Sequence, residues 1–269
     1  MNPLPPGTDL CSVPAGTPPP GETYNLTNPY SLAPTMIAVS TVVTSWAFLF
    51  VVIRIWNNRR KLLAADYMII FGIIWDIGFT SLILSQSRSA RHQWNIPACW
   101  LNEAYLKVIF LISALFGFTG VCKAVILLMY LQIFSVSRRM RIAVWIGLVF
   151  DFIIYIPCIP IAVVYQAPHY GQTWDDVFLI ETEYQTSVLA PWGIATGAAS
   201  ILLDSYIVIL PLTILSILQL SLSKKIQVSL VFLTAFAGVA ASAVALYYRV
   251  QLLGMEDRTW QNVNFQIAL

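Results

Sequence analysis

The chain of 269 residues is 58% hydrophobic and only 10% charged, with a formal net charge of +2 and a mean hydropathy of +0.73. A soluble globular domain carries about 25% charged residues, so this composition excludes a soluble protein with one large core and predicts a protein of the lipid bilayer. We expect no nucleic-acid partner.

Residues 1–33 form a Pro-, Gly- and Thr-rich segment that we predict to be an extended, disordered tail. The segment lacks a basic start followed by an apolar stretch, so we expect no cleavable signal peptide. Asn25 begins the tripeptide NLT, a candidate N-glycosylation site if the tail lies outside the cytosol. A chance match of three residues is the alternative.

Apolar stretches long enough to cross a hydrocarbon layer of about 30 Å, which takes roughly 20 helical residues, follow the tail. They cover residues 34–55, 67–87, 104–134, 142–165, 195–220 and 226–253. We predict helices because lipid cannot satisfy exposed backbone N–H and C=O groups. Residues 264–269 read as the beginning of another apolar segment. The predicted fold is therefore an all-α polytopic bundle over 34–269, with six helices visible and a truncated seventh; a six-helix protein with a frayed end is the alternative.

Basic residues gather in the short connections after the first, third and fifth predicted helices, whereas residues 1–33 contain no Lys or Arg. The positive-inside rule therefore places the N-terminus outside the cytosol and these basic residues at the inner face. The inner-face set comprises Arg54, Arg59, Arg60, Lys61, Arg138, Arg139, Arg141, Lys224 and Lys225. With this orientation Cys11 and Cys99 both lie in an oxidising compartment, where we predict a candidate disulfide between them; two separate thiols are the alternative.

Ionisable residues also occur inside the predicted spans, where a charge costs about 2.5–3.5 kcal/mol on insertion scales and often marks function. They are Asp76, Lys123, Asp151 and Asp204, with Arg249 nearer the outer end of the sixth helix. At 1.5 Å per residue the first three lie roughly 14–16 Å above the inner ends of their helices, and Asp204 lies near mid-membrane. Either a buried ion pair fixes the helix packing here, or the residues form a site for a ligand, a proton or a conformational switch.

We predict Asp76 as the partner of Lys123, because a short connection makes the second and third helices neighbours. Arg249 is expected to extend towards the interface between Tyr247 and Tyr248. Only two histidines occur, and the sequence has no metal-ligand cluster, phosphate-binding loop or nucleophile motif. We therefore expect no cofactor, no bound metal and no enzymatic activity.

Several segments together resemble the fungal rhodopsin-domain integral membrane proteins. The segment VIRIWNNRRKLLAADYMII is similar to the family's Arg-rich turn, KAVILLMYLQIF to its signature on the third helix, and ASILLDSYIVILPLTILSILQLSLSKKIQVSLVF to its block on the fifth and sixth helices. Lys123, Asp204 and Arg249 fall on family positions. The sequence departs from the family pattern at Ala65 and Gln132, and it has no Asp/Glu-Arg-Tyr triplet.

The resemblance implies seven helices with the N-terminus outside. It favours a receptor-like sensor in which the outer loops meet a small-molecule or surface ligand and the basic inner face meets a cytosolic signalling partner. A transporter or accessory membrane protein of a fungal toxin (secondary-metabolite) pathway is the alternative. Retinal is not implied, because Lys123 is on the third helix rather than on the last. We expect a multi-pass protein of the plasma membrane or of an endomembrane.

Overall fold

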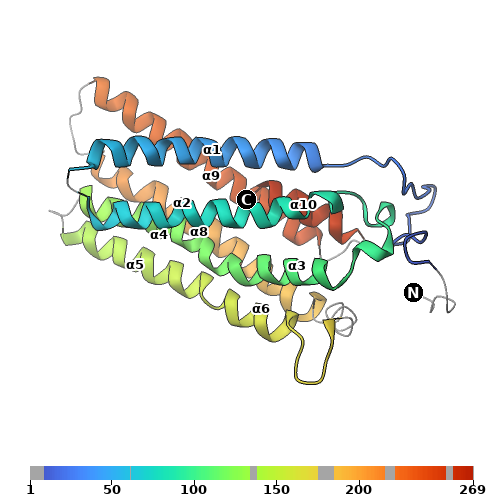
Figure 1. The fold of residues 1–269 in the computed structure, drawn as a ribbon. Coiled ribbons are helices and arrows are strands. Elements are labelled where there is room, and N and C mark those ends of the chain that lie inside the picture. The colour runs from blue at the N-terminus through green and yellow to red at the C-terminus, as the bar shows by residue number, and fades with distance from the viewer. Residues whose placement is uncertain are drawn as a thin grey trace.

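The computed structural model describes residues 9–60, 62–133, 138–174, 185–215, 222–252 and 257–268. Over these residues the chain consists of helices and connections, with one isolated bridge between Pro14 and Pro97. The long helices lie side by side, and successive crossings of the bundle run in opposite directions (Figure 1). We call the end that carries the N-terminal segment the tail end, and the end that carries Arg59, Arg60, Arg138 and Arg139 the basic end.

The α-helices, in chain order, are α1 (Ala33–Asn58), α2 (Ala64–Ser85), α3 (Glu103–Leu115), α4 (Gly120–Ile133), α5 (Arg138–Tyr155), α6 (Cys158–Gln166), α8 (Ala190–Leu215), α9 (Leu222–Gln251) and α10 (Arg258–Ala268). Short 3₁₀ turns are η1 (Ser87–Ser89), η2 (Gln93–Asn95), η3 (Ala98–Trp100) and η4 (Phe116–Thr119), and a π-helical turn, η5 (Gln185–Leu189), precedes α8.

Within the described residues, five helical segments are long and apolar enough to cross a membrane. They are Ala33–Asn58, Asp66–Ser85, Glu103–Leu131, Arg138–Gln166 and Ser187–Leu212. The all-α, multi-pass character predicted from hydropathy is thus confirmed. α9 is a further helix of 30 residues. A total of six or seven crossings and an N-terminus outside the cytosol stay predictions.

Two of the predicted helices are interrupted where they approach each other. The third crossing passes from α3 through the tighter turn η4 into α4, and the fourth breaks at Pro157 between α5 and α6. Proline lacks the backbone N–H that would continue the ladder. At Gly117 in η4, an added Cβ would lie 2.8 Å from the carbonyl oxygen of Tyr155. Only a residue without a side chain permits this contact between the two backbones.

Apolar side chains divide between the interior and the outward surface of the bundle. One cluster joins α4, α5 and α8 around Leu127, Val144 and Leu203, all of which are fully buried. Outward-facing side chains on α1 and α5 are also large and apolar, including Trp46 (63% exposed) and Phe152 (63% exposed). Exposed apolar surface on this scale is typical of helices that face lipid.

The described part of the N-terminal segment lies along the α2–α3 connection and is hydrogen-bonded to it. Ala15 donates to the carbonyl of Ile96 at 2.8 Å, and Ala98 donates to that of Val13 at 2.9 Å. Closer to α1, Leu32 donates to the carbonyl of Ala90 at 2.8 Å. The prediction of a disordered tail over 1–33 is therefore wrong for residues 9–32, because backbone pairing with the connection, which composition does not encode, holds the segment.

Candidate functional site

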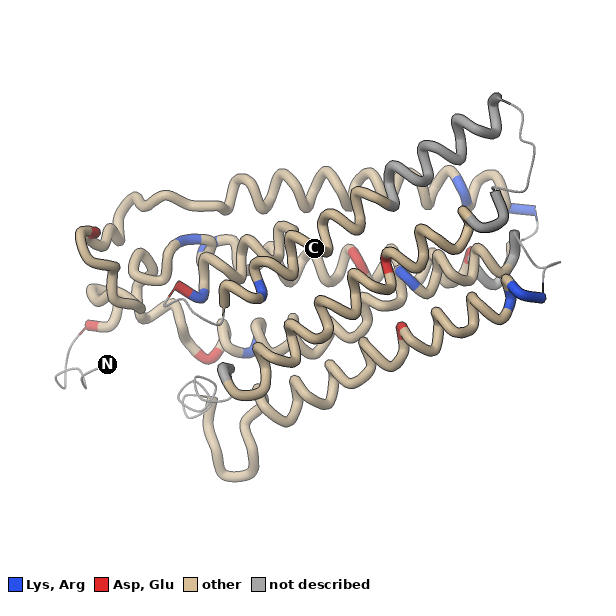
Figure 2. The backbone as a smooth tube through the Cα atoms, turned by 180° about the vertical axis from the view of Figure 1, so that it is seen from behind, with Lys and Arg blue, Asp and Glu red and all other residues tan. Residues whose placement is uncertain are grey.

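Lys123 on α4 lies at the centre of a polar network midway along the bundle, where Figure 2 shows basic and acidic positions among residues of other kinds. Its Nζ is 2.6 Å from Asp204 Oδ1 on α8, and both side chains are 16% exposed. The same ammonium donates to Ser200 Oγ at 2.6 Å and to the Ser200 carbonyl at 3.3 Å. An ammonium has three protons to donate, so these acceptors account for all of them.

Asp204 and Ser200 extend this network to two further helices. Ser242 on α9 donates to Asp204 Oδ2 at 2.5 Å, and Tyr155 on α5 donates to Ser200 Oγ at 3.1 Å. The Tyr155 ring also lies 5.8 Å from Lys123 Nζ. We call Lys123, Tyr155, Ser200, Asp204 and Ser242 the central network. It joins α4, α5, α8 and α9 through charged and hydroxyl groups inside an apolar bundle.

The predicted partnership between Lys123 and Asp76 is wrong, because Lys123 pairs with Asp204 instead. α4 does pack against α2, as the short connection implies, but it also packs against α5 and α8. The connection makes two helices neighbours without setting their rotation, and adjacent residues on a helix point about 100° apart. Lys123 faces α8, whereas Cys122 lies within electrostatic range of Asp76 and Asp151.

Asp76 and Asp151 lie near the central network but outside its hydrogen bonds. Asp76 Oδ2 and Asp151 Oδ1 are buried and have no hydrogen-bond partner among the residues that the structure describes. Asp151 on α5 is within electrostatic range of both Lys123 and Asp204, and its Oδ1 lies 3.2 Å from the position of a Cβ added at Gly120. Buried carboxylate oxygens normally have partners, so these two atoms mark positions for water, a proton or a ligand.

Arg249 on α9 lies between aromatic rings rather than between Tyr247 and Tyr248, so that expectation is wrong. Its guanidinium carbon is 4.9 Å from the centroid of Phe116 and 4.5 Å from that of Phe265. One guanidinium nitrogen, Nη1, donates to the Gly193 carbonyl and, at 2.8 Å, to Thr196 Oγ1 on α8. The packing of α10 beside α9 supplies Phe265, which no pattern within α9 itself indicates.

The basic end contains an ion pair that fixes the turn between α1 and α2. Arg54 Nε lies 2.9 Å from Asp66 Oδ1, and the Asp66 side chain is fully buried. Asp66 Oδ2 accepts from the backbone N–H of Leu63 at 2.9 Å, which closes the first turn of α2. Arg59 lies 4.8 Å from the ring centroid of Trp56. These two cations of the inner-face set therefore have structural contacts.

The structure describes only some of the remaining members of the inner-face set. Arg60 and the first residues of α5, Arg138, Arg139 and Arg141, are placed at the basic end, and the last three begin a helix. Lys61 lies outside the described residues, and so do the side chains of Lys224 and Lys225 in the first turn of α9.

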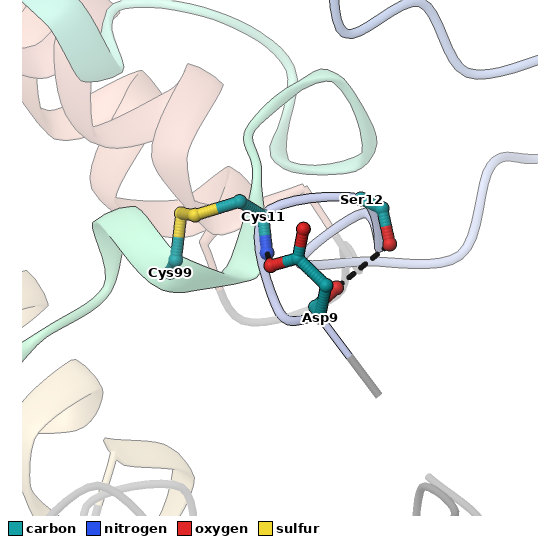
Figure 3. Close-up of a disulfide and its surroundings, with 4 residues drawn as sticks. All are labelled: Asp9, Cys11, Ser12 and Cys99. Atoms are coloured by element: carbon teal, nitrogen blue, oxygen red, sulfur yellow. Dashed lines mark hydrogen bonds between the residues drawn. A yellow bond between two sulfur atoms is a disulfide. The ribbon is translucent and has the colours of Figure 1, made fainter. Parts of the chain in front are cut away.

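A disulfide joins Cys11 to Cys99 at the tail end, across 88 residues of sequence (Figure 3). Next to it, Asp9 Oδ1 accepts from the backbone N–H of Cys11 at 2.9 Å. Asn25 is exposed, and its backbone N–H donates to Asn95 Oδ1 at 2.8 Å. The glycosylation sequon is thus held on the same connection, and its modification stays a prediction.

A second cluster at the tail end anchors the last helix, and sequence reasoning did not find it. His92 Nδ1 lies 2.5 Å from Asp257 Oδ2, and the His92 ring is stacked between Trp94 (4.7 Å) and Trp260 (3.9 Å). Asp257 Oδ1 also accepts from the backbone N–H of Gln93 at 2.9 Å. The partners are about 165 residues apart in sequence, so no local spacing could have indicated them.

Ser200 and Ser242 were also missed as members of the central network. A signal existed for Ser200, because it precedes Asp204 by one helical turn and so shares its face. Ser242 lies in a run of small residues that reads as a packing face. Among the described residues, no group of three or more His, Cys, Asp or Glu side chains is arranged to hold a metal ion.

The pattern of the fungal rhodopsin domain matches residues 49–268, which include α2 to α10 and every member of the central network. No curated protein matches the chain, and neither does any solved structure. Since the match covers most of the sequence, the chain belongs to the fungal rhodopsin domain family.

Proposed function

We propose that this multi-pass membrane protein is a receptor-like, non-enzymatic sensor in which the central network sets the arrangement of the helices. The observation that carries the proposal is the closure of that network. Lys123 is matched by Asp204 and Ser200, and both carboxylate oxygens of Asp204 are occupied, one by Lys123 and one by Ser242. A closed set of charge-assisted bonds across several helices holds one arrangement and loses many contacts together when that arrangement changes.

In this proposal the ligand acts at the tail end and the response reaches a cytosolic signalling partner at the basic end. The network lies between the two ends, and its α9 member, Ser242, is on the helix that also carries Arg249. A ligand shifts the equilibrium only by its differential affinity for the two arrangements. Weakening the network should therefore mimic the ligand in part.

A direct test uses the purified protein in lipid nanodiscs with a G-protein α subunit as the trial signalling partner. Lys123→Met should change basal association with the subunit several-fold, because it removes the cation that closes the network. Lys107→Met is the matched control: Lys107 pairs with Glu103 at 2.7 Å but is 51% exposed on α3. Equal association of the wild type and the Lys123→Met protein would contradict the proposed role.

A transporter or accessory protein of a toxin pathway is the second candidate, and the unpartnered oxygens of Asp76 and Asp151 favour it. Ionisable side chains that face the interior of a membrane bundle often mark proton and substrate paths. Solute or proton flux into liposomes that is lost in Asp151→Asn, together with no association with the α subunit in any variant, would support this candidate over the sensor.

A further inference from the structure

Arg249 is a cation inside the bundle whose surroundings do not neutralise it. No carboxylate lies within 4.0 Å of its guanidinium among the residues that the structure describes. Its acceptors are the Gly193 carbonyl and Thr196 Oγ1, which are neutral and both bind Nη1. An arginine stays charged in proteins, and an uncompensated charge inside a membrane bundle is costly. An anion bound beside Arg249 would compensate this charge.

The guanidinium presents a free edge to such an anion. It has five N–H donors in a planar fork, and the described acceptors use only those on Nη1. Nε and Nη2 together form the pair of parallel donors that binds a carboxylate with two hydrogen bonds. The rings of Phe116, in η4, and Phe265, in α10, lie beside the guanidinium, at 4.9 and 4.5 Å from its central carbon.

Further contacts define the surroundings of the guanidinium. The buried indole N–H of Trp192, the residue before Gly193 on α8, is directed at the Cys158 sulfur, and Arg249 is within electrostatic range of the same sulfur. The indole therefore lies near the guanidinium. In addition, Gly197 allows the Arg249 stem to lie against α8, since an added Cβ would be 3.3 Å from Arg249 Cδ.

We infer that Arg249 forms the binding site for an organic monocarboxylate with an aromatic or aliphatic body. The fork would bind the carboxylate, and the rings of Phe116 and Phe265 would contact the apolar body. A singly charged carboxylate fits better than a phosphate ester, because one cation with apolar walls compensates one charge. The inference names the ligand class of the proposed sensor and rests on that function.

Tyr155 connects this site to the central network. Its ring lies 6.0 Å from the Phe116 ring beside Arg249, and its hydroxyl donates to Ser200 in the network. A ligand that displaces Phe116 would therefore move the residue that holds Ser200. Binding at Arg249 and rearrangement at Lys123 are thus linked by one side chain.

The experiment measures binding of matched acid and alcohol probes to the purified full chain in nanodiscs, by tryptophan fluorescence and thermal shift. The probes are the carboxylates 3-phenylpropanoate and octanoate and their neutral counterparts 3-phenylpropanol and octanol. We expect a carboxylate to bind the wild type at least tenfold more tightly than its alcohol. The preference should be lost in Arg249→Gln and reduced in Arg249→Lys, which keeps the charge but not the fork. Arg88→Gln removes an exposed arginine at the same end and should bind as the wild type does.

Equal binding of acid and alcohol, a preference that survives Arg249→Gln, or no carboxylate binding at all would overturn the site. Arg249→Lys keeps the test valid if Arg249→Gln fails to fold. The outcome is separable from that of the proposed function. If carboxylate binding depends on Arg249 but Lys123→Met leaves association with the signalling partner unchanged, the sensor is refuted and the binding site stands. If Lys123→Met changes that association but no carboxylate binds, the binding site is refuted and the sensor stands.

Discussion

Lys123 and Arg249 are both cations within the bundle, and their surroundings differ. Lys123 has a carboxylate and two serine oxygens within hydrogen-bond distance, whereas Arg249 has neutral acceptors and aromatic rings. A paired charge in low dielectric stabilises one packing of its helices, while an unpaired one is retained at a cost in stability. This contrast supports the two proposed roles: Lys123 in the central network that sets the helix arrangement, and Arg249 in carboxylate binding.

The pairing of Lys123 with Asp204 predicts a specific coupling between the two residues. Lys123→Met and Asp204→Asn should each lower the free energy of unfolding in detergent by about 3–5 kcal/mol, because each leaves a buried charge or polar partner unmatched. The double variant should lose at least about 1 kcal/mol less than the sum of the single losses.

Asp76→Asn provides the control for this cycle. Asp76 is also an aspartate inside a span, but it does not pair with Lys123, so losses from Asp76→Asn and Lys123→Met should add. A coupling for Asp76 as large as that for Asp204 would contradict the pairing in the structure.

Gly117 gives a second prediction at this scale. Gly117→Ala would place a Cβ 2.6 Å from Ile159 Cγ1 and 2.8 Å from the Tyr155 carbonyl oxygen. The crowding of a backbone atom should cost about 1–3 kcal/mol of stability, measured as a lower unfolding temperature. Gly78→Ala on α2 is the matched control, because nothing lies within 4 Å of its added Cβ. That variant should be neutral or more stable by up to about 1 kcal/mol, and an equal loss in both would contradict the close approach.

Individual elements depend on contacts at their ends, and α10 is the clearest case. It has 11 residues, too few for a helix that is stable alone. Asp257 accepts at 3.4 Å from the backbone N–H of Trp260 in its first turn, and the same carboxylate pairs with His92. Stacking of Trp260 on His92 adds contact area. The helix is therefore held by the α2–α3 connection, which the disulfide in turn ties to the N-terminal segment.

Asp257→Ala should release α10 locally without unfolding the bundle. The loss of a helix cap costs about 0.5–2 kcal/mol, so amide hydrogen exchange in residues 258–268 should become roughly 2- to 30-fold faster. Asp9→Ala, at an exposed aspartate of the same end, should leave that exchange unchanged. Uniform acceleration across all helices would instead indicate that Asp257 supports the global fold.

The whole molecule carries its charges asymmetrically along the bundle, and this asymmetry predicts its orientation. The basic end has Arg54, Arg59 and Arg60 close to one another in sequence, whereas the tail end has the disulfide and the sequon at Asn25. Basic connections are retained on the cytosolic side during insertion. The tail end should therefore face the lumen or the exterior.

Orientation can be measured without knowledge of the function. In a eukaryotic host Asn25 should carry a glycan that a glycosidase removes and that Thr27→Ala abolishes. In intact cells or sealed vesicles, a membrane-impermeant thiol reagent should label Tyr24→Cys, a position that is 53% exposed, and should not label Arg59→Cys. Labelling of Arg59→Cys in place of Tyr24→Cys would indicate the opposite orientation. An absent glycan alone would refute only the predicted modification of Asn25.

Sequence by itself determined the class of the protein and most of its helices. Hydropathy is a sum over local residues, and lipid leaves a spanning backbone few alternatives to the helix, so the helical spans and the intramembrane position of Lys123 and Asp204 follow from the local order of apolar residues. Tertiary structure alone decided which residues meet. The rotation of α4 selects Asp204 over Asp76, α10 brings Phe265 to Arg249, and the α2–α3 connection binds the N-terminal segment. These contacts join residues far apart in the chain, and packing geometry rather than any local period sets them.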